Sequence, residues 1–217
     1  MKKFKLTSEF IVDISGVKLF RIKALIEFGN VKAGDLGGYI EKEENLSHMG
    51  DAWVSGDARI SGDAQVFGDA WVFGNARVFG DAWVFGNARV SGNAQVFGNA
   101  RVFGNAWVSG NARVFGDAQV SGNARVSGNA RVFGDAQVSG DARVSGDKDY
   151  AYAHGFGSCN RTTTFFRLKD GDVGVRCGCF YGTLAQFRDK VCETHGETKK
   201  AQEYLMLADL MEIRFKN

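Results

Sequence analysis

The sequence predicts a mainly β protein built around a parallel β-solenoid, with a small β-rich cap before it and an α+β cap after it. Over residues 50–145 one hexapeptide, Gly-Asp/Asn-Ala-x-Val-Phe/Ser, repeats sixteen times without a gap. A unit of six residues cannot bury its own apolar face, so neighbouring units must stack into one continuous core. The 217 residues therefore divide into an N-terminal cap at 1–49, the repeat at 50–146 and a C-terminal cap at 147–217.

Each position of the hexapeptide has a predictable role. Ala and Val lie two positions apart, with Ile60 replacing Val once, so period-two alternation points both toward the interior. The variable residue between them and the Phe or Ser after Val point outward. Gly with Asp or Asn supplies the corner, because these residues tolerate turn conformations. Each buried Val contributes about 1.5 kcal/mol. Both ends of such a stack are open strand ladders, and both need a cover.

The N-terminal cap is expected to be a hairpin followed by a lead-in to the repeat. Residues 10–14 and 17–22 are β-rich runs around Ser15-Gly16, a combination that predicts a hairpin. Residues 34–39, which are rich in Gly, are expected to form a turn.

The C-terminal cap is expected to be α+β. Residues 162–168 and 173–180 flank a Lys-Asp-Gly-Asp turn and predict a second hairpin. Thr183 is a suitable N-cap for a helix that ends near Gly196, and a second helix should cover about 199–215. The apolar residues expected to pack on one face of that second helix are Tyr204, Leu205, Leu207, Leu210, Met211 and Ile213.

Charge and composition argue against several classes of protein. The net charge is +2, and no segment forms a basic arm or an acidic tail, so binding to a phosphate backbone is not favoured. No apolar stretch of about 18 residues predicts a membrane span. Glu9 and Asp13 stand where a signal peptide needs an apolar run. The four cysteines, Cys159, Cys177, Cys179 and Cys192, all lie in the last third of the chain, and an intracellular protein keeps such thiols reduced, so a cytoplasmic location is expected.

An aliphatic residue followed four positions later by a small one resembles the hexapeptide pattern of left-handed parallel β-helices. That resemblance implies triangular coils of three hexads, or about 18 residues, and hence about five coils here. Folding the sequence at this period gives three outward faces with unequal columns. The first carries Trp53, Trp71, Arg89, Trp107, Arg125 and Arg143; the second carries Arg59, Arg77, Gln95, Arg113 and Arg131 beside Phe79, Phe97, Phe115 and Phe133; the third carries Gln65, Trp83, Arg101, Gln119 and Gln137 beside Phe67, Phe85 and Phe103.

The outward Phe columns are the candidate binding surface. A contiguous exposed apolar patch marks an interface, and aromatic and Arg residues are enriched at interface centres. Three interpretations stay open: rings that only stabilise the sheet by cross-strand pairing, an interface between copies of the chain in a dimer or trimer, and a surface for a different protein. The candidate binding residues are Phe79, Phe97, Phe115, Phe133, Arg59, Arg77, Arg113, Arg131, Phe67, Phe85, Phe103 and Trp83.

The repeat does not favour catalysis. The acyltransferases with this type of repeat resemble one another in using a catalytic His and a loop inserted between coils. Here the hexads have no insertion, and no His lies between His48 and His154. His48, His154 and His195 could each act as a general base, but each has an ordinary structural interpretation. We therefore expect no catalytic residues.

Zinc is the one metal that the tail could suggest. Cys177, Cys179, Cys192 and His195 have the ligand types of a zinc site. However, Cys177 and Cys179 alternate with Val along a strand, and Cys192 shares a helical stripe with apolar residues. The thiols are therefore expected to face the core as small apolar groups, without a metal or other cofactor.

The segments that flank the repeat resemble those of hexapeptide-repeat proteins of bacteriophages and prophages. The resemblance rests on residues 35–47 (DLGGYIEKEENLS) before the repeat, and on TTFF at 163–166, CGCF at 177–180 and ETHG at 193–196 after it. Members of this group are often labelled acyltransferases from the repeat alone.

The resemblance implies an accessory protein, and small accessory phage proteins are often inhibitors of host defence. We therefore expect a non-enzymatic, cytoplasmic protein that self-associates and engages a host protein. Two alternatives stay open: an acyl-CoA-dependent acyltransferase acting at subunit boundaries, and sequestration of a small anionic ligand such as a nucleotide.

Overall fold

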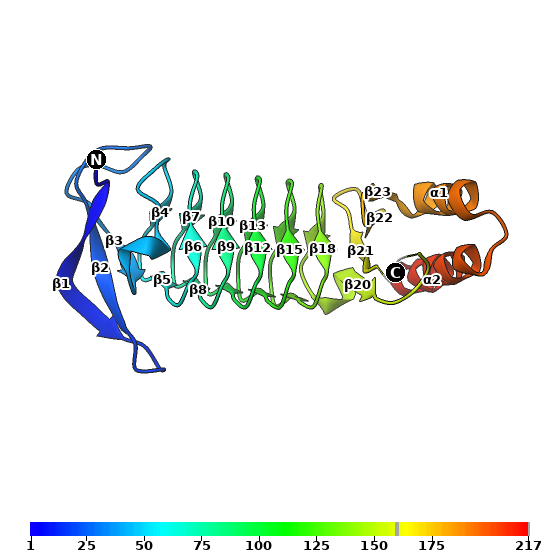
Figure 1. The fold of residues 1–217 in the computed structure, drawn as a ribbon, viewed down its shortest axis with the longest axis horizontal. Coiled ribbons are helices and arrows are strands. Elements are labelled where there is room, and N and C mark those ends of the chain that lie inside the picture. Colours follow the sequence, from blue (N-terminus) through cyan, green and yellow to red (C-terminus); the bar gives the residue numbers. More distant parts are fainter. Residues whose placement is uncertain (159–160, 217) are drawn as a thin grey trace.

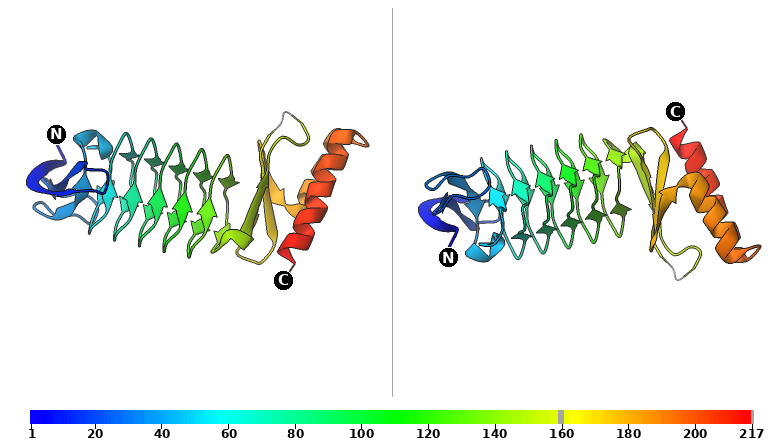
Figure 2. Two further views of the ribbon diagram at one scale, coloured as in Figure 1. Left: turned by 90° about the horizontal axis from the view of Figure 1, so that it is seen from below. Right: turned by 90° about the horizontal axis from the view of Figure 1, so that it is seen from above.

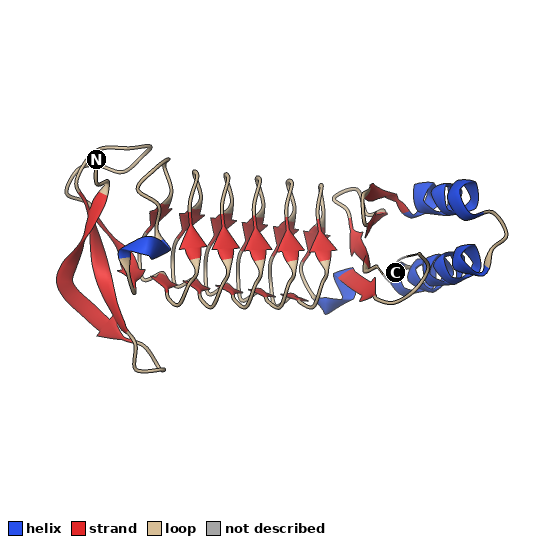
Figure 3. Cartoon of the chain, viewed as in Figure 1, coloured by secondary structure: helices blue, strands red, loops and turns tan. Residues whose placement is uncertain are grey.

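A parallel β-solenoid of about six turns forms the body of the molecule, as the computed structural model shows for residues 1–158 and 161–216 (Figure 1). An antiparallel hairpin lies at one end, and a four-stranded antiparallel sheet with two helices lies at the other. Views from above and below show the same elongated arrangement (Figure 2), and strands dominate the chain up to the two C-terminal helices (Figure 3). The predicted mainly β fold class is confirmed.

The solenoid has three faces, each a stack of parallel two-residue strands apart from the longer β3. The first face contains β4 (Trp53–Val54), β7 (Trp71–Val72), β10 (Arg89–Val90), β13 (Trp107–Val108), β16 (Arg125–Val126) and β19 (Arg143–Val144). The second contains β3 (Leu36–Ile40), β5 (Arg59–Ile60), β8 (Arg77–Val78), β11 (Gln95–Val96), β14 (Arg113–Val114) and β17 (Arg131–Val132). The third contains β6 (Gln65–Val66), β9 (Trp83–Val84), β12 (Arg101–Val102), β15 (Gln119–Val120) and β18 (Gln137–Val138).

The repeat positions behave as the pattern predicts. Every Ala and Val of the hexads, and Ile60, lies inside the solenoid with at most 1% of its surface exposed. The first Gly of each hexad turns the corner in the left-handed region of backbone space. At Gly98, for example, φ is +68°, and an added Cβ would lie 3.1 Å from the backbone N of Gly116 in the next coil. Glycine is therefore required there by both conformation and space.

The solenoid has about six turns rather than the expected five, because the N-terminal cap contributes the first one. Residues 34–39 were expected to form a turn, and this expectation is wrong: Leu36–Ile40 is strand β3, which pairs in parallel with β5. On the third face, Leu46 forms a parallel bridge with Val66. A sequence that departs from the hexapeptide thus continues the same coil.

The predicted N-terminal hairpin is confirmed. Strand β1 (Phe4–Val12) pairs antiparallel with β2 (Lys18–Ala24), and Gly16 in the connection has φ of +86°. Strand β2 also pairs with β3, so the hairpin extends the sheet of the second face. A short 3-10 helix, η1 (Glu43–Asn45), then leads into the repeat.

Side-chain donors from the cap complete the carbonyl end of the solenoid. On the first face the buried Nζ of Lys3 donates to the carbonyl oxygens of Gly50 at 3.1 Å and Ala52 at 2.8 Å. On the third face Nδ2 of Asn45 donates to the carbonyl oxygens of Gly62 and Ala64 in the third hexad, at 2.9 Å each. The backbone of β3 and Glu41 supplies the donors on the second face. These groups satisfy carbonyls that would otherwise be buried without partners.

Side-chain acceptors complete the opposite, amide end. The backbone N–H of Arg131 donates to Asp147, that of Gln137 to Oγ1 of Thr164, and that of Ser145 to Asp149. One acceptor therefore serves each face. Asp147 and Asp149 belong to the 3-10 helix η2 (Asp147–Asp149), which directly follows the last hexad.

The C-terminal cap is a four-stranded antiparallel sheet covered by two helices. The sheet order is β20 (Tyr150–Ala153), β21 (Thr163–Arg167), β22 (Val173–Cys177) and β23 (Phe180–Thr183). The predicted hairpin is β21–β22. The helices α1 (Leu184–His195) and α2 (Lys199–Phe215) also lie where they were predicted, with Thr183 as the N-cap of α1 and Gly196 as its C-cap.

The apolar face predicted for α2 is only partly correct. Tyr204 and Met211 are buried, but Leu210 is 54% exposed and Ile213 is 70% exposed. The buried stripe instead consists of Ala201, Tyr204, Ala208, Met211 and Phe215. Of the helices in the described residues, none is long and apolar enough to cross a membrane.

Candidate binding surface

The predicted columns are in register at a spacing of 18 residues. Strand pairing aligns Arg59 with Arg77 and Arg113 with Arg131, and Gln95 stands between these pairs on β11. On the third face Trp83 stands between Gln65 and Arg101. The structure thus brings the predicted residues of each face together as continuous outward rows.

The Phe residues of the second face form one stacked ladder, here called the second-face ladder. Phe79, Phe97, Phe115 and Phe133 have ring-centroid separations of 4.8, 4.9 and 5.3 Å, and interplanar angles of 2°, 1° and 12°. Tyr152 meets the last ring edge-on at 5.7 Å. Because the rings stack face to face, the ladder presents mainly ring edges to its surroundings.

A shorter third-face ladder runs along the neighbouring corner. Phe67, Phe85 and Phe103 stack at 4.9 Å with nearly parallel rings. Trp83 contacts Phe67 edge-on at 5.9 Å, and the guanidinium of Arg101 lies 5.3 Å from the Trp83 ring centre. Trp83 is 38% exposed, so it forms an accessible aromatic and cationic pair beside the ladder.

The ladders contribute to stability whatever else they do. Six of the seven Phe side chains are half-buried, and Phe133 is 39% exposed. An aromatic pair of this kind contributes about 0.5–1.5 kcal/mol beyond the area it buries. The interpretation that the rings stabilise the sheet therefore has direct support, and a binding role would be additional to it.

The arginines of the second face carry charge that the described residues do not neutralise by salt bridges. Arg113 and Arg131 are exposed, and Arg59 and Arg77 are half-buried. Among residues 1–158 and 161–216, no carboxylate lies within salt-bridge distance of any of the four. Aligned guanidinium groups repel one another, and the acidic corner beside them, at Asp63, Asp81, Asp117 and Asp135, partly offsets this charge.

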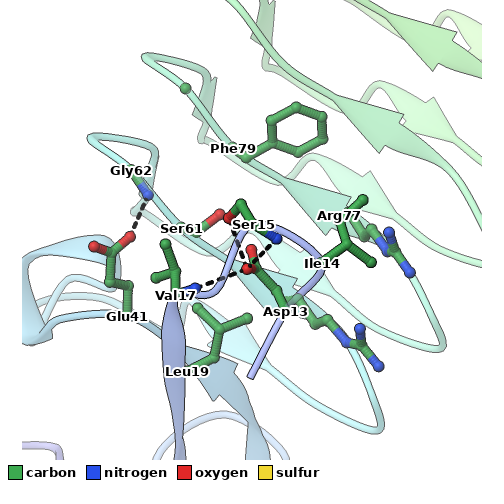
Figure 4. Close-up of a pocket in the computed structure, with 12 residues that line it drawn as sticks. Asp13, Ile14, Ser15, Val17, Leu19, Glu41, Ser61, Gly62, Arg77 and Phe79 are labelled. Atoms are coloured by element: carbon green, nitrogen blue, oxygen red, sulfur yellow. Dashed lines mark hydrogen bonds between the residues drawn. The ribbon is translucent and has the colours of Figure 1, made fainter. Parts of the chain in front are cut away.

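Sequence reasoning did not find the cavity of about 460 Å³ between the tip of the β1–β2 hairpin and the second face. Ile14, Val17 and Leu19 line it from the hairpin, and Arg77 and Phe79 line it from the solenoid (Figure 4). The outward columns did single out Phe79, Arg59 and Arg77, which line this cavity. However, no signal in the sequence places the hairpin tip over this particular face.

Each histidine has a structural environment. His48 stacks on Phe4 at 4.3 Å, and its Nδ1 accepts a hydrogen bond from the backbone N of Lys3. His154 lies near the end of the solenoid, 2.9 Å from Oγ1 of Thr162. His195 stacks on Tyr204 at 5.8 Å. The three side chains lie on different elements and do not form a common site.

The cysteines differ from the prediction that all face the core. Cys177 is half-buried and packs against the C-terminal core, but Cys179 and Cys192 are exposed. Cys179 lies in the turn between β22 and β23, where strand alternation has ended. Cys159 lies outside the described residues. Within the described part of the chain, no group of three or more His, Cys, Asp and Glu side chains could hold a metal ion.

Together these features define a class of protein: a capped parallel β-solenoid with aromatic ladders on its outer faces. The chain is similar to the family described as the YdcK beta solenoid repeat, which matches residues 94–110, 106–122, 118–134, 124–137 and 136–147. These overlapping matches all fall in the second half of the solenoid and its junction with the C-terminal cap. No curated protein matches the chain.

Proposed function

We propose that this protein is a non-enzymatic binding protein that self-associates and engages a protein partner through its two Phe ladders. The distribution of Phe carries the proposal. Eight hexads end in Phe and eight in Ser, and seven of the eight Phe residues fall in two columns. Only Phe73 lies elsewhere, on the first face. Since Ser is accepted at this position throughout the solenoid, folding alone does not require the rings.

The charge beside the second-face ladder adds to this argument. Arg113 and Arg131 flank Phe115 and Phe133 and are exposed without salt bridges in the described residues. A row of ring edges with adjacent guanidinium groups matches the composition of interface centres, where aromatic and Arg residues are enriched. The partner surface that would complement it is apolar with acidic groups at its margin.

The resemblance to phage and prophage hexapeptide-repeat proteins suggests the purpose of such binding. A small accessory protein of that kind would act in the host cell, and its target would be a host protein. We propose that the target is a component of host defence and that binding inhibits it. An acyltransferase activity has less support, because the coils contain no inserted loop and the three histidines serve separate structural contacts.

The double substitution of Phe97 and Phe115 by Ser tests the proposal. The change removes the two middle rings but introduces a residue already used at this position, so circular dichroism should show the fold intact. Light scattering after size exclusion should show a smaller assembly, or at least tenfold weaker association, than for the unchanged chain. Host proteins captured by the unchanged chain should be lost from the variant.

Phe73→Ser is the matched control, because it makes the same chemical change outside the ladders. This control should keep the assembly and the captured proteins. Assembly and capture that both survive the double substitution would overturn the proposal. The enzymatic alternative requires that the protein bind acyl-CoA, which calorimetry would measure. It also requires that His48→Ala or His154→Ala lower the rate of acyl transfer.

A further inference from the structure

At its N-terminal end the second-face ladder stops at Phe79, because the preceding coil carries Ser instead of Phe in the same column. The residue one coil before Phe79 in the same column is Ser61, and the backbone N of Ser61 donates to the carbonyl of Val78 at 3.1 Å, in register with the strand below. One face of the Phe79 ring stacks on Phe97 at 4.8 Å. No ring of the described residues stacks on its other face, on the side of Ser61.

The hairpin tip lies beside the space next to this free ring face. Ser61 and Phe79 both line the cavity of about 460 Å³, together with Ile14 and Val17 of the hairpin. Figure 4 shows the hairpin tip beside the coil that carries Phe79, with Ile14 next to Arg77. Cavities of about 300–1,000 Å³ are the size that holds small molecules. A planar ring placed over Ser61 would extend the ladder by one step within apolar walls.

The carboxylates and the arginines of this cavity differ in whether their side chains have hydrogen-bond partners within the protein. Oδ1 of Asp13 accepts from the backbone N of Ser15 at 2.9 Å and from its hydroxyl at 2.7 Å, and Glu41 accepts from the backbone N of Gly62 at 2.7 Å. One oxygen of each carboxylate therefore accepts hydrogen bonds within the protein. Arg59 and Arg77, aligned one coil apart, make no salt bridge among the described residues, although hydrogen bonds from Ser15 and the charge of Arg59 lower the pKa of Asp13. Their guanidinium donors remain open to a ligand.

We propose that this cavity binds a small molecule in which a planar aromatic ring carries an anionic group. The ring stacks on the free face of Phe79 above Ser61, with Ile14 and Val17 against its edges. The anionic group, a carboxylate or a phosphate, accepts hydrogen bonds from Arg59 and Arg77. This site shares Phe79 with the second-face ladder but does not depend on the proposed protein interface, because all of its lining residues belong to one chain.

Calorimetric titration with 1-naphthoate tests the proposal, with 1-naphthamide as the same ring without the charge. The carboxylate should bind once per chain, and the neutral amide about tenfold more weakly, the difference expected from losing charge-assisted hydrogen bonds. Adenosine monophosphate forms a second arm with a phosphate in place of the carboxylate. The ligand that binds more tightly shows whether the site prefers a carboxylate or a phosphate. The substitutions below should weaken the binding of both ligands.

The repeat supplies a variant that fills the site and a control that does not. Ser61→Phe extends the second-face ladder into the cavity and should abolish binding of 1-naphthoate. Ser121→Phe extends the third-face ladder by the same step, far from the cavity, and should leave binding within twofold. Both place Phe where other coils already carry it, so both should fold.

Removing the contacts gives a second, independent comparison. Phe79→Ser and Arg77→Gln should each weaken binding about tenfold, the size expected for one stacking contact or one charged contact. Phe73→Ser and Arg125→Gln make the same changes on the first face, outside the cavity and outside both ladders, and should have no effect. The proposal is wrong if 1-naphthoate does not bind the unchanged chain, if Ser61→Phe still binds it, or if the distant variants weaken it equally.

Discussion

The pH dependence of unfolding provides a sharp test of how Lys3 closes the carbonyl end of the solenoid. Lys3 is 1% exposed, and its Nζ donates to the carbonyls of Gly50 and Ala52. Burial lowers the pKa of Lys3 from 10.5 to about 8, although Asp51 and Asp69 act in the opposite direction. A neutral amine keeps two N–H donors, enough for both carbonyls.

The sign of the effect follows from proton binding. Between pH 8 and pH 10.5 the unfolded chain holds a proton on Lys3 that the folded chain has released. The free energy of unfolding therefore rises with pH in this window, by about 1.4 kcal/mol per pH unit and about 3 kcal/mol in all. Below pH 8 both states are protonated, so the cost of burying the charge is fully present and this dependence disappears.

Urea denaturation at pH steps from 7.0 to about 9.5 measures the rise, of which about 2 kcal/mol should fall in that range. Burial also raises the pKa of Tyr150 above its ordinary value, so the unfolded chain ionises there first and stability declines at higher pH. The measurement therefore stops below the ordinary range for tyrosine. Lys3→Met removes the titrating group and should flatten the curve. Equal slopes in the two proteins would refute the assignment to Lys3.

Three further predictions concern the caps and the corners. Asn45→Leu leaves two carbonyls of the first coil without donors and should lower the free energy of unfolding by about 2–4 kcal/mol in urea titrations. Gly98→Ala, at φ of +68°, should cost about 1–3 kcal/mol by the same method, whereas Gly146→Ala, at φ of −158° with open space around it, should change stability by less than about 0.5 kcal/mol. Burial alone would raise the pKa of Asp149, but hydrogen bonds from Ser145 and Gly146 keep it below its ordinary value. The stability from this carboxylate is therefore present at neutral pH and lost as pH falls through the folded-state pKa, and acid titration of Asp149→Asn should show a smaller loss.

The solenoid and its columns could be predicted because the information is periodic and local. The alternation of Ala and Val sets the inward side, Gly sets the corner, and one period places Phe79 over Phe97 once a coil length is known. Local signals also predicted both helices: α1 is capped by the adjacent residues Thr183 and Gly196, and α2 follows within a few residues. In each case the residues that determine a feature lie close to it in the sequence or at a fixed number of residues from it.

The parts that could not be predicted depend on contacts without a period. Lys3 reaches carbonyls 47 and 49 residues away, and nothing in its neighbourhood distinguishes it from the exposed Lys5. Helix α2 carries two apolar stripes, and the pattern alone does not say that Ala208 and Met211 are covered while Leu210 is exposed. The rest of the C-terminal cap decides between them, because Ala208 and Met211 join one core cluster with Phe165 and Val175 of the sheet and Phe187 of α1.

The two caps differ because the ends of a parallel stack differ chemically. The first coil exposes carbonyls, and its cover consists of N–H donors from Lys3, Asn45 and the backbone of β3. The last coil exposes N–H groups, and its cover consists of acceptors from Asp147, Asp149 and Thr164. An end-to-end stack of two such rods would have to displace these groups. The caps therefore favour association through the side faces, where the ladders lie.

The N-terminal hairpin is longer than it needs to be to cover the end of the solenoid. Strand β3 alone pairs with the open edge of the second face, yet β1 and β2 continue past the side of the solenoid (Figure 1). Their projecting end carries Val12, which is 55% exposed, and Ile14, which is 94% exposed. Exposed apolar side chains at a projecting tip contribute little to the stability of the fold and are free to contact a ligand. Ile14→Ser should therefore leave the free energy of unfolding unchanged within about 0.5 kcal/mol while weakening ligand binding in the adjacent cavity, a combination that a purely structural hairpin would not produce.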